Sequence, residues 1–248
     1  MPVKRPPAGR LVHRRRNGRF FLEIAAHPEY GLPFGQDRLV LIWVATLAVR
    51  QQSRTVQFDS AAQLLDEFDL PADGRHYRRM VEAFQRVFTS TIFFGTSPGC
   101  ADALEGGRVH FFDALDLWFS PSTVDCSRNE NVIRLSEAFW NELRSHPIPI
   151  QRDAVRALAS SPGCLDLYLW LRWRSFGLQQ QQVIPIAGPN GLAMQLGPDD
   201  YSRERDFRRT LGRWLDRIRL VWPTCPCDLG WAGLTLAITP QNSQTRVN

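Results

Sequence analysis

Residues 202–220 read SRERDFRRTLGRWLDRIRL, and this stretch decides how the rest of the chain is interpreted. Apolar side chains recur in it at the three- and four-residue spacing of a helix with one buried face. The other side of the same helix carries arginines. The pattern predicts a helix that packs on a core along one face and presents positive charge along the other. The apolar positions are Phe207, Leu211, Trp214, Leu215 and Ile218.

An earlier stretch, RHYRRMVEAFQRVF at residues 75–88, has the same design. When the chain is shifted by 127 residues, the apolar positions of its two halves coincide. A fixed offset of this kind indicates an internal repeat. The matched pairs are Trp43 with Trp170, Val56 with Val183, Met80 with Phe207, Phe84 with Leu211, Val87 with Trp214, and Phe88 with Leu215.

Each half predicts the order helix, strand, helix, helix, strand, strand, which is the order of a winged helix-turn-helix. In the first half, the predicted hairpin joins TIFF at 91–94 to RVHFF at 108–112. In the second half, it runs from VW at 221–222 to LTLAIT at 234–239. We therefore predict an α+β fold with two tandem winged-helix domains related by an internal repeat.

The predicted domain boundaries follow changes in composition along the chain. The first winged-helix domain is expected to serve oligomerisation and DNA binding, and the second is expected to recognise DNA. The predicted parts are a basic flexible N-terminal arm at 1–30, winged-helix domain 1 at 31–120, a connecting strand and helix at 121–150, winged-helix domain 2 at 151–240, and a tail at 241–248.

Charge is distributed unevenly along the chain. The net charge is +5, but residues 1–19 carry +7 before the first acid, Glu23, so the remaining chain is net −2. Within that acidic remainder, residues 75–86 carry +3 and residues 202–219 carry +4. Positive charge gathered in short segments of an otherwise acidic chain indicates a polyanionic partner that binds at defined places.

The arginines in these segments are the candidate contacts to double-stranded DNA, because a guanidinium reaches guanine edges and phosphates in the major groove. For both helices the alternative is a solvated face balanced by nearby acids. The candidates are Arg203, Arg205, Arg208, Arg209, Arg213 and Arg217 in the second half, Arg75, Arg78, Arg79 and Arg86 in the first half, and Arg14, Arg15, Arg16 and Arg19 as backbone contacts from the flexible arm.

Three segments resemble the plasmid-encoded RepA-type replication initiators. They are LPFGQDRLVLIWVATLAVR at 32–50, AFWNELRSHPIPIQRDAVRALASSPGCLDLYLWLRWR at 138–174, and YSRERDFRRTLGRWLDRIR at 201–219. The resemblance spans about residues 31–240, and its middle segment is the most specific. It implies a protein that binds repeated origin sites through tandem winged helices, promotes opening of the duplex and recruits host replication proteins. A transcriptional regulator built from the same modules is the alternative.

No catalytic, metal or cofactor site is predicted, so we expect a protein that is not an enzyme. The five histidines are scattered, and no two have the spacing of metal ligands. Cys225 and Cys227 could supply two thiolates but lack a second pair, which favours two free thiols in a hairpin loop. No glycine-rich segment has the spacing and lysine of a phosphate-binding loop.

Two further expectations concern location and self-association. The longest apolar stretch, 39–49, has about 11 residues, fewer than the roughly 18 that a membrane span needs, so we expect a cytoplasmic protein without membrane contact. The predicted hairpin of the first domain carries four phenylalanines in TIFF and VHFF. An exposed apolar patch of this kind indicates self-association through domain 1, unless the rings fold back on Trp118 and the core.

Overall fold

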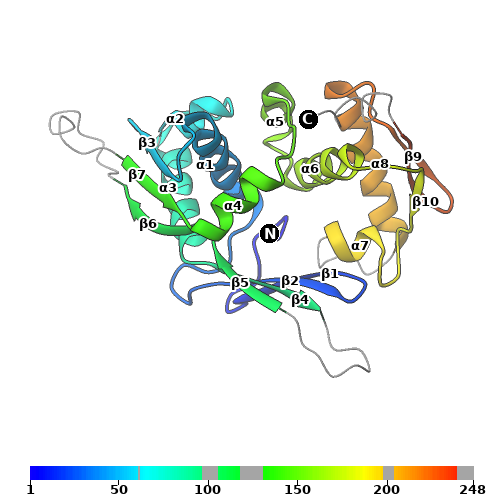
Figure 1. Cartoon of the computed structure of the whole chain (residues 1–248), viewed down its shortest axis with the longest axis horizontal. Helices are drawn as coiled ribbons and strands as arrows, with labels where there is room; N and C mark the ends of the chain where they lie inside the picture. The colour runs from blue at the N-terminus through cyan, green and yellow to red at the C-terminus, as the bar shows by residue number, and fades with distance from the viewer. Residues whose placement is uncertain (61, 97–105, 118–130, 198–203, 239–248) are drawn as a thin grey trace. The chain divides into compact units, whose positions relative to one another are not determined.

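The computed structural model of the chain describes residues 1–60, 62–96, 106–117, 131–197 and 204–238. Contacts within the chain divide it into two compact units (Figure 1). The described residues of the first unit fall within Met1–Arg14, Leu22–Phe94 and Glu105–Pro147. Those of the second unit fall within Arg15–Phe21, Gly95–Leu104 and Ile148–Asn248.

The core of the first unit forms around a largely apolar helix, α1 (Arg38–Gln51). Trp43 of this helix is buried between two rings, with its ring centroid 4.7 Å from that of Phe58 and 6.3 Å from that of Phe84. Phe58 ends strand β3 (Thr55–Phe58), and Phe84 belongs to α3 (Gly74–Phe88). A short helix, α2 (Ala62–Glu67), lies between them in the sequence. The helix predicted at 75–88 is thereby confirmed, with its apolar face in the core.

Helix α3 begins where the sequence supplies an acceptor for its first amides. The carboxylate of Asp73 accepts hydrogen bonds from the backbone N–H groups of Arg75 and His76, at 2.9 and 2.8 Å. This N-cap satisfies donors that have no partner within the helix. The cap fixes where α3 begins, and the buried side chains of Met80, Phe84 and Val87 determine which face of the helix is turned to the core.

A three-stranded antiparallel sheet closes the first unit on one side, in the order β3-β7-β6. Strand β6 is Phe112–Asp116, and β7 is Asn131–Leu135. Val56 pairs with Ile133, and both side chains are fully buried. Helix α4 (Glu137–Ser145) follows β7 and is capped by Ser136, whose hydroxyl accepts a hydrogen bond from the N–H of Phe139 at 3.2 Å.

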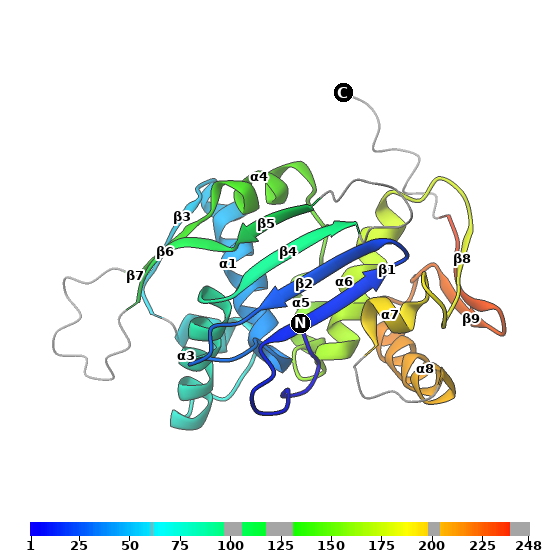
Figure 2. The ribbon, with the colours of Figure 1, turned by 90° about the horizontal axis from the view of Figure 1, so that it is seen from below.

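A second sheet has the order β1-β2-β4-β5 (Figure 2). Its strands are β1 (Val12–Asn17), β2 (Phe20–Ala25), β4 (Thr91–Thr96) and β5 (Gly106–His110). The prediction of a flexible N-terminal arm is therefore wrong. Gly18 has φ +60°, which suits a tight turn, and the side chain of His13 is fully buried. The carbonyl of Pro2 also accepts hydrogen bonds from Gly35 N–H and from the Arg38 guanidinium, each at 3.0 Å.

The hairpin predicted from TIFF and RVHFF is partly corrected. Strands β4 and β5 are neighbours, as expected, but they extend the sheet of β1 and β2 and do not pair with β3. Phe112 already belongs to β6, where it is buried and stacks on Phe88 with a centroid distance of 6.4 Å. Of the four phenylalanines, only Phe94 is strongly exposed. Trp118, the other suggested partner of these rings, lies outside the described residues.

The second unit contains four helices and one sheet among its described residues. Its helices are α5 (Arg152–Leu158), α6 (Pro162–Phe176), α7 (Leu192–Leu196) and α8 (Glu204–Val221). Its strands are β8 (Gln182–Ile184), β9 (Cys227–Gly230) and β10 (Gly233–Leu236), in the antiparallel order β8-β10-β9. The strand predicted at 221–222 is wrong, because α8 continues to Val221 and the hairpin begins at Cys227.

The core of the second unit depends on a close approach of α6 to α8. A Cβ atom added to Gly163 would overlap the indole ring of Trp214, so glycine is required where the helices meet. Tyr168 is fully buried, and its hydroxyl accepts a hydrogen bond from Gln151 N–H at 3.1 Å. The apolar face predicted for residues 202–220 is confirmed, since Phe207, Leu211 and Ile218 are completely buried.

The two units share one sheet order. In the first unit, β3 follows α1 and pairs with β7, which also pairs with β6. In the second unit, β8 follows α6 and pairs with β10, which also pairs with β9. The α+β class predicted from the sequence is confirmed. Among the described residues, no helix combines the length and apolar character that crossing a membrane requires.

Candidate nucleic-acid interface

Four arginines form a continuous line along the exposed side of α8, which we call the arginine stripe. They occur at every fourth residue, so successive side chains lie one helical turn apart. All four are exposed. The stripe extends about 18 Å along the helix axis, at about 1.5 Å per residue. Its members are Arg205, Arg209, Arg213 and Arg217.

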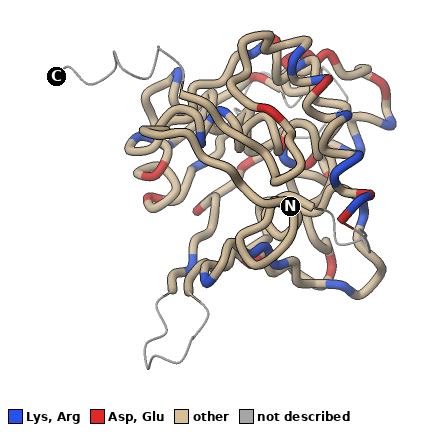
Figure 3. Tube along the Cα trace, turned by 90° about the vertical axis from the view of Figure 1, so that its right-hand side faces the viewer, with Lys and Arg blue, Asp and Glu red and all other residues tan. Residues whose placement is uncertain are grey.

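Two members of the stripe make weak local contacts within α8. Arg209 lies 3.4 Å from the carboxylate of Asp206, with 74% of its side chain exposed. Arg213 donates a hydrogen bond to the hydroxyl of Thr210 at 3.0 Å. Exposed pairs of this kind contribute about 0–1 kcal/mol, so a phosphate group can replace them at little cost. Figure 3 marks all Lys and Arg residues of the described chain in blue and all Asp and Glu residues in red.

Arg208, also predicted to contact DNA, makes hydrogen bonds within the second unit that the sequence did not predict. Its guanidinium donates to the backbone carbonyls of Gly230 and Trp231, the latter at 3.2 Å, and it is half-buried. It therefore fixes the β9–β10 hairpin against α8 and is not part of the exposed stripe. Arg203, also predicted to contact DNA, lies outside the described residues.

The β9–β10 hairpin is attached to α8 at its other end as well. Arg219 donates to the carbonyl of Cys227 at 3.2 Å and lies 3.6 Å from the carboxylate of Asp228. Trp231, at the turn, is 93% exposed. Trp222, before the hairpin, instead packs edge-on to Tyr168 with a centroid distance of 6.1 Å. Of these two tryptophans, only Trp222 packs against the rest of the unit.

Helix α3 of the first unit also presents arginines, but fewer than α8. Arg75, Arg78 and Arg79 are exposed near its N-terminal end. Farther along the helix the exposed residues are Glu82 and Gln85. The positive surface of α3 is therefore confined to about its first two turns.

Arg86 is the clearest correction to the predicted contacts. Its Nε and one terminal nitrogen donate to the two carboxylate oxygens of Asp37, at 2.7 and 3.1 Å. Only 12% of the Arg86 side chain and 7% of that of Asp37 are exposed. Burial works against the charged guanidinium, but the hydrogen bonds and charge of Asp37 outweigh it, aided by Glu82, and raise the pKa of Arg86. Arg86 stabilises the first unit from inside and does not belong to its exposed surface.

The arginines of the predicted arm lie on the β1–β2 hairpin. Arg14 forms an ion pair with Glu23 of the neighbouring strand at 2.6 Å. Arg15 is half-buried, while Arg16 is exposed. Arg19, in the turn itself, stacks over the ring of Phe20 at 5.2 Å. Four of the seven basic residues that the sequence assigned to a mobile tail are thus carried by an ordered strand pair and its turn.

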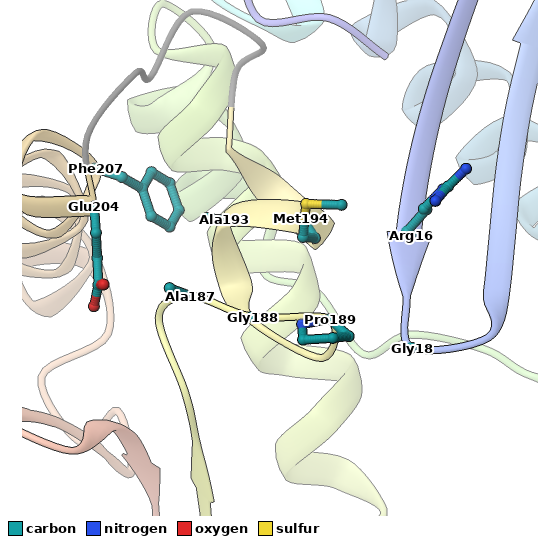
Figure 4. A pocket seen from close by; sticks show the side chains of 9 residues that line it. All are labelled: Arg16, Gly18, Ala187, Gly188, Pro189, Ala193, Met194, Glu204 and Phe207. Atoms are coloured by element: carbon teal, nitrogen blue, oxygen red, sulfur yellow. The ribbon is translucent and has the colours of Figure 1, made fainter.

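The second unit contains a pocket of about 430 Å³ near the start of α8 (Figure 4). Phe207 and Glu204 line it from α8, and Met194 lines it from α7. The tip of the β1–β2 hairpin, which clusters with this unit, completes the lining through Gly18, whose N–H donates to the carbonyl of Pro189 at 2.8 Å. The lining is mostly apolar and is suited to a small apolar group.

Cys225 and Cys227 lie together at the base of the β9–β10 hairpin, with their sulfur atoms 3.3 Å apart. The hydrogen bond between the thiols lowers the pKa of Cys227, which the charge of Arg219 lowers further, and raises that of Cys225. Within the part of the chain that the structure describes, no three His, Cys, Asp or Glu side chains are grouped to hold a metal ion.

Comparison with known proteins bears on the segment from the start of α3 to the end of β8. Residues 72–184 match the family of plasmid encoded RepA proteins. This match confirms the resemblance predicted from the sequence. It includes the exposed arginines of α3 and all of α6, whereas α8 and its hairpin follow it in the chain.

Two solved structures of domains 2 and 3 of RctB share the fold. One, of selenomethionine derivatives, has a TM-score of 0.63, and the other has a TM-score of 0.60. In each case 14% of the residues are identical, and the match covers 87% of this chain and 80% of the RctB chain. No curated protein sequence matches the chain.

Proposed function

We propose that this protein is a plasmid replication initiator that binds repeated origin DNA through two winged-helix units, promotes opening of the duplex and recruits host replication proteins. The RepA family match supports a role in plasmid replication. The observation that carries the DNA-binding part of the proposal is the arginine stripe of α8, exposed on one side of a helix whose other side is buried.

The element order supports the winged-helix interpretation. In the second unit, α6, β8, α7 and α8 precede the β9–β10 hairpin, and the three strands form one sheet. In the first unit, α1, β3, α2 and α3 precede the β6–β7 hairpin, with β4 and β5 inserted before it. In winged helices of this order, the third helix enters the major groove.

The geometry of α8 fits that placement. The major groove is about 12 Å wide and accepts one helix. The stripe gives four guanidinium groups on the side of α8 away from its core, where they can reach phosphates or guanine edges. Two units with similar elements suit a site with two half-sites, and repeated sites are what an origin offers to such a protein. We assign the first unit a weaker DNA contact, through Arg75, Arg78 and Arg79.

The proposal is tested by replication in cells. The coding sequence, together with the DNA that flanks it, is cloned on a fragment lacking any other origin, and transformants are counted. The initiator should sustain the replicon, and Arg209→Ala combined with Arg213→Ala should abolish it. Binding of the purified chain to the flanking DNA, with no replication from the fragment, would contradict the initiator role and leave only DNA binding.

A transcriptional regulator is the second candidate. The pocket between α7 and the start of α8 favours it, because a small apolar ligand there would contact Phe207 of the helix that carries the stripe. For a regulator, the flanking DNA would include a promoter whose activity the protein changes, and the fragment would not replicate. The same cloned fragment with a reporter gene separates the two functions.

A further inference from the structure

The β9–β10 turn places a large apolar side chain in solvent. Residues Gly230 and Gly233 are paired across the hairpin, so Trp231 and Ala232 form the two-residue turn between them. Trp231 is 93% exposed, and Ala232 is exposed as well. Tryptophan normally buries much of its surface, and a ring held outside the fold is typical of a residue that packs against a partner.

The ring is presented on a fixed support. Gly233 has φ +146°, and a Cβ atom there would overlap the carbonyl of Ile184, so the turn is built closely against β8. Arg208 donates to the carbonyls of Gly230 and Trp231 and thereby attaches the turn to α8. The backbone that carries the indole is thus held while Trp231 itself is 93% exposed, which is preorganisation for binding.

The attachment of the β9–β10 turn to α8 by Arg208 indicates what kind of molecule Trp231 contacts. Arg208 is adjacent in sequence to Arg209, a member of the arginine stripe, so the hairpin tip lies beside the part of α8 that carries the stripe. A partner that spans both must accept several positive charges and one flat apolar ring. Duplex DNA does so when an apolar side chain enters the minor groove beside a major-groove contact and partly unstacks a base step.

We propose that Trp231 is a wedge that enters the minor groove of DNA bound by α8 and bends the duplex at that step. This inference rests on the proposed DNA-binding function of the second unit. Arg208 acts as the positioning residue, because it sets where the ring meets the groove. The inference also connects binding with the opening of an origin, since a partly unstacked step is an early stage of strand separation.

The test uses the full chain and a 40-bp duplex that the wild-type protein recovers from a random-sequence pool. Trp231→Ala is compared with Trp173→Ala, a matched control that removes another exposed tryptophan of the same unit, 52% exposed on α6. Dissociation constants come from fluorescence anisotropy, and bending comes from the mobility of circularly permuted fragments. Trp231→Phe, which keeps an aromatic ring, is measured alongside them, and circular dichroism checks that each variant is folded.

We expect Trp231→Ala to weaken binding about tenfold, within the range of one aromatic stacking contact, and to reduce the bend, while Trp173→Ala changes neither. Trp231→Phe should retain most of the bend. Arg208→Ala should reduce the bend with a smaller loss of affinity, because the ring remains but loses its support.

Two results would overturn the wedge. Wild-type bending by Trp231→Ala would show that the ring does not enter the base stack, even if affinity fell. Equal losses in Trp231→Ala and Trp173→Ala would show a general effect of removing exposed rings. In both cases the wild-type chain still binds the duplex, so the proposed function stands; failure of the wild-type chain to recover any duplex would instead refute the proposed function.

Discussion

Replacing Arg86 by alanine should lower the stability of the first unit and leave the DNA affinity of the folded protein unchanged. The substitution removes two hydrogen bonds to Asp37 and leaves a carboxylate that is 7% exposed without its cation. Asp37 keeps one donor, the N–H of Phe34 at 2.9 Å, which only partly compensates. The substitution also removes the cation–π contact between the Arg86 guanidinium and the ring of Phe34, which lies 4.9 Å from it.

The expected cost is about 3 kcal/mol, at the lower end of the range for breaking a buried ion pair because one donor to Asp37 remains. For a unit of this size, that cost corresponds to a fall of roughly 10 °C in melting temperature. Urea unfolding followed by circular dichroism, at 25 °C, measures it directly. DNA affinity is measured on the same samples under conditions where the variant is fully folded.

The matched control is Arg79→Ala on the same helix, an exposed arginine in the predicted DNA-contacting set. It should leave stability within about 0.5 kcal/mol of wild type, as exposed substitutions usually do, and should weaken DNA binding. The assignment of Arg86 to the interior would be refuted if Arg79→Ala were the destabilised variant and Arg86→Ala the one with weakened DNA binding. An Arg86→Ala protein with wild-type stability and weakened DNA binding would show that Arg86 contacts DNA.

Four further outcomes are expected. Arg213→Ala should cost about 1–3 kcal/mol of binding if it reads a base edge, whereas an equal loss on specific and random duplexes, with a salt slope lower by about 0.9, would show a phosphate contact. Gly163→Ala should destabilise the second unit by about 1–3 kcal/mol through overlap with the indole of α8, whereas Gly212→Ala, whose new Cβ would be 3.9 Å from its nearest neighbour, should stabilise it by about 0.5–1 kcal/mol in urea unfolding. The Cys164 thiol is fully buried, which raises its pKa to about 11, so iodoacetamide at pH 8 should modify it only when the unit unfolds, as mass spectrometry would show. The hydrogen bonds from His76 lower the pKa of Asp73, so its cap stabilises α3 above the ordinary aspartate pKa of 3.8, and the melting-temperature difference between wild type and Asp73→Ala should shrink as pH falls below that value.

The helices were predictable because their signal is local. The apolar positions of α3 and α8 recur within one or two turns, and both helices occur where that spacing placed them. The same spacing separates the exposed arginines from the buried face. Arg86 could not be distinguished in this way, because its partner, Asp37, is 49 residues away and no pattern in the sequence joins them.

The sheets were less predictable because their partners are distant. β1 contains three consecutive arginines, and only His13 of its side chains is fully buried, so the strand has no clear apolar alternation. TIFF and RVHFF were joined as a hairpin on the basis of their proximity, and they are neighbours. The sheet they extend, however, includes strands from the start of the chain, more than 60 residues earlier.

The position of β1 gives its arginines a significance apart from nucleic acid. β1 is an edge strand of its sheet, and an edge strand offers unpaired backbone groups to which a strand of another molecule can add. Two copies that joined through this edge would bring Arg14, Arg15 and Arg16 of each chain close to those of the other. The repulsion between like charges opposes that pairing and so protects the protein from edge-to-edge aggregation. Substituting these arginines by threonine, which favours strands and has no charge, would remove this protection from one edge of the sheet.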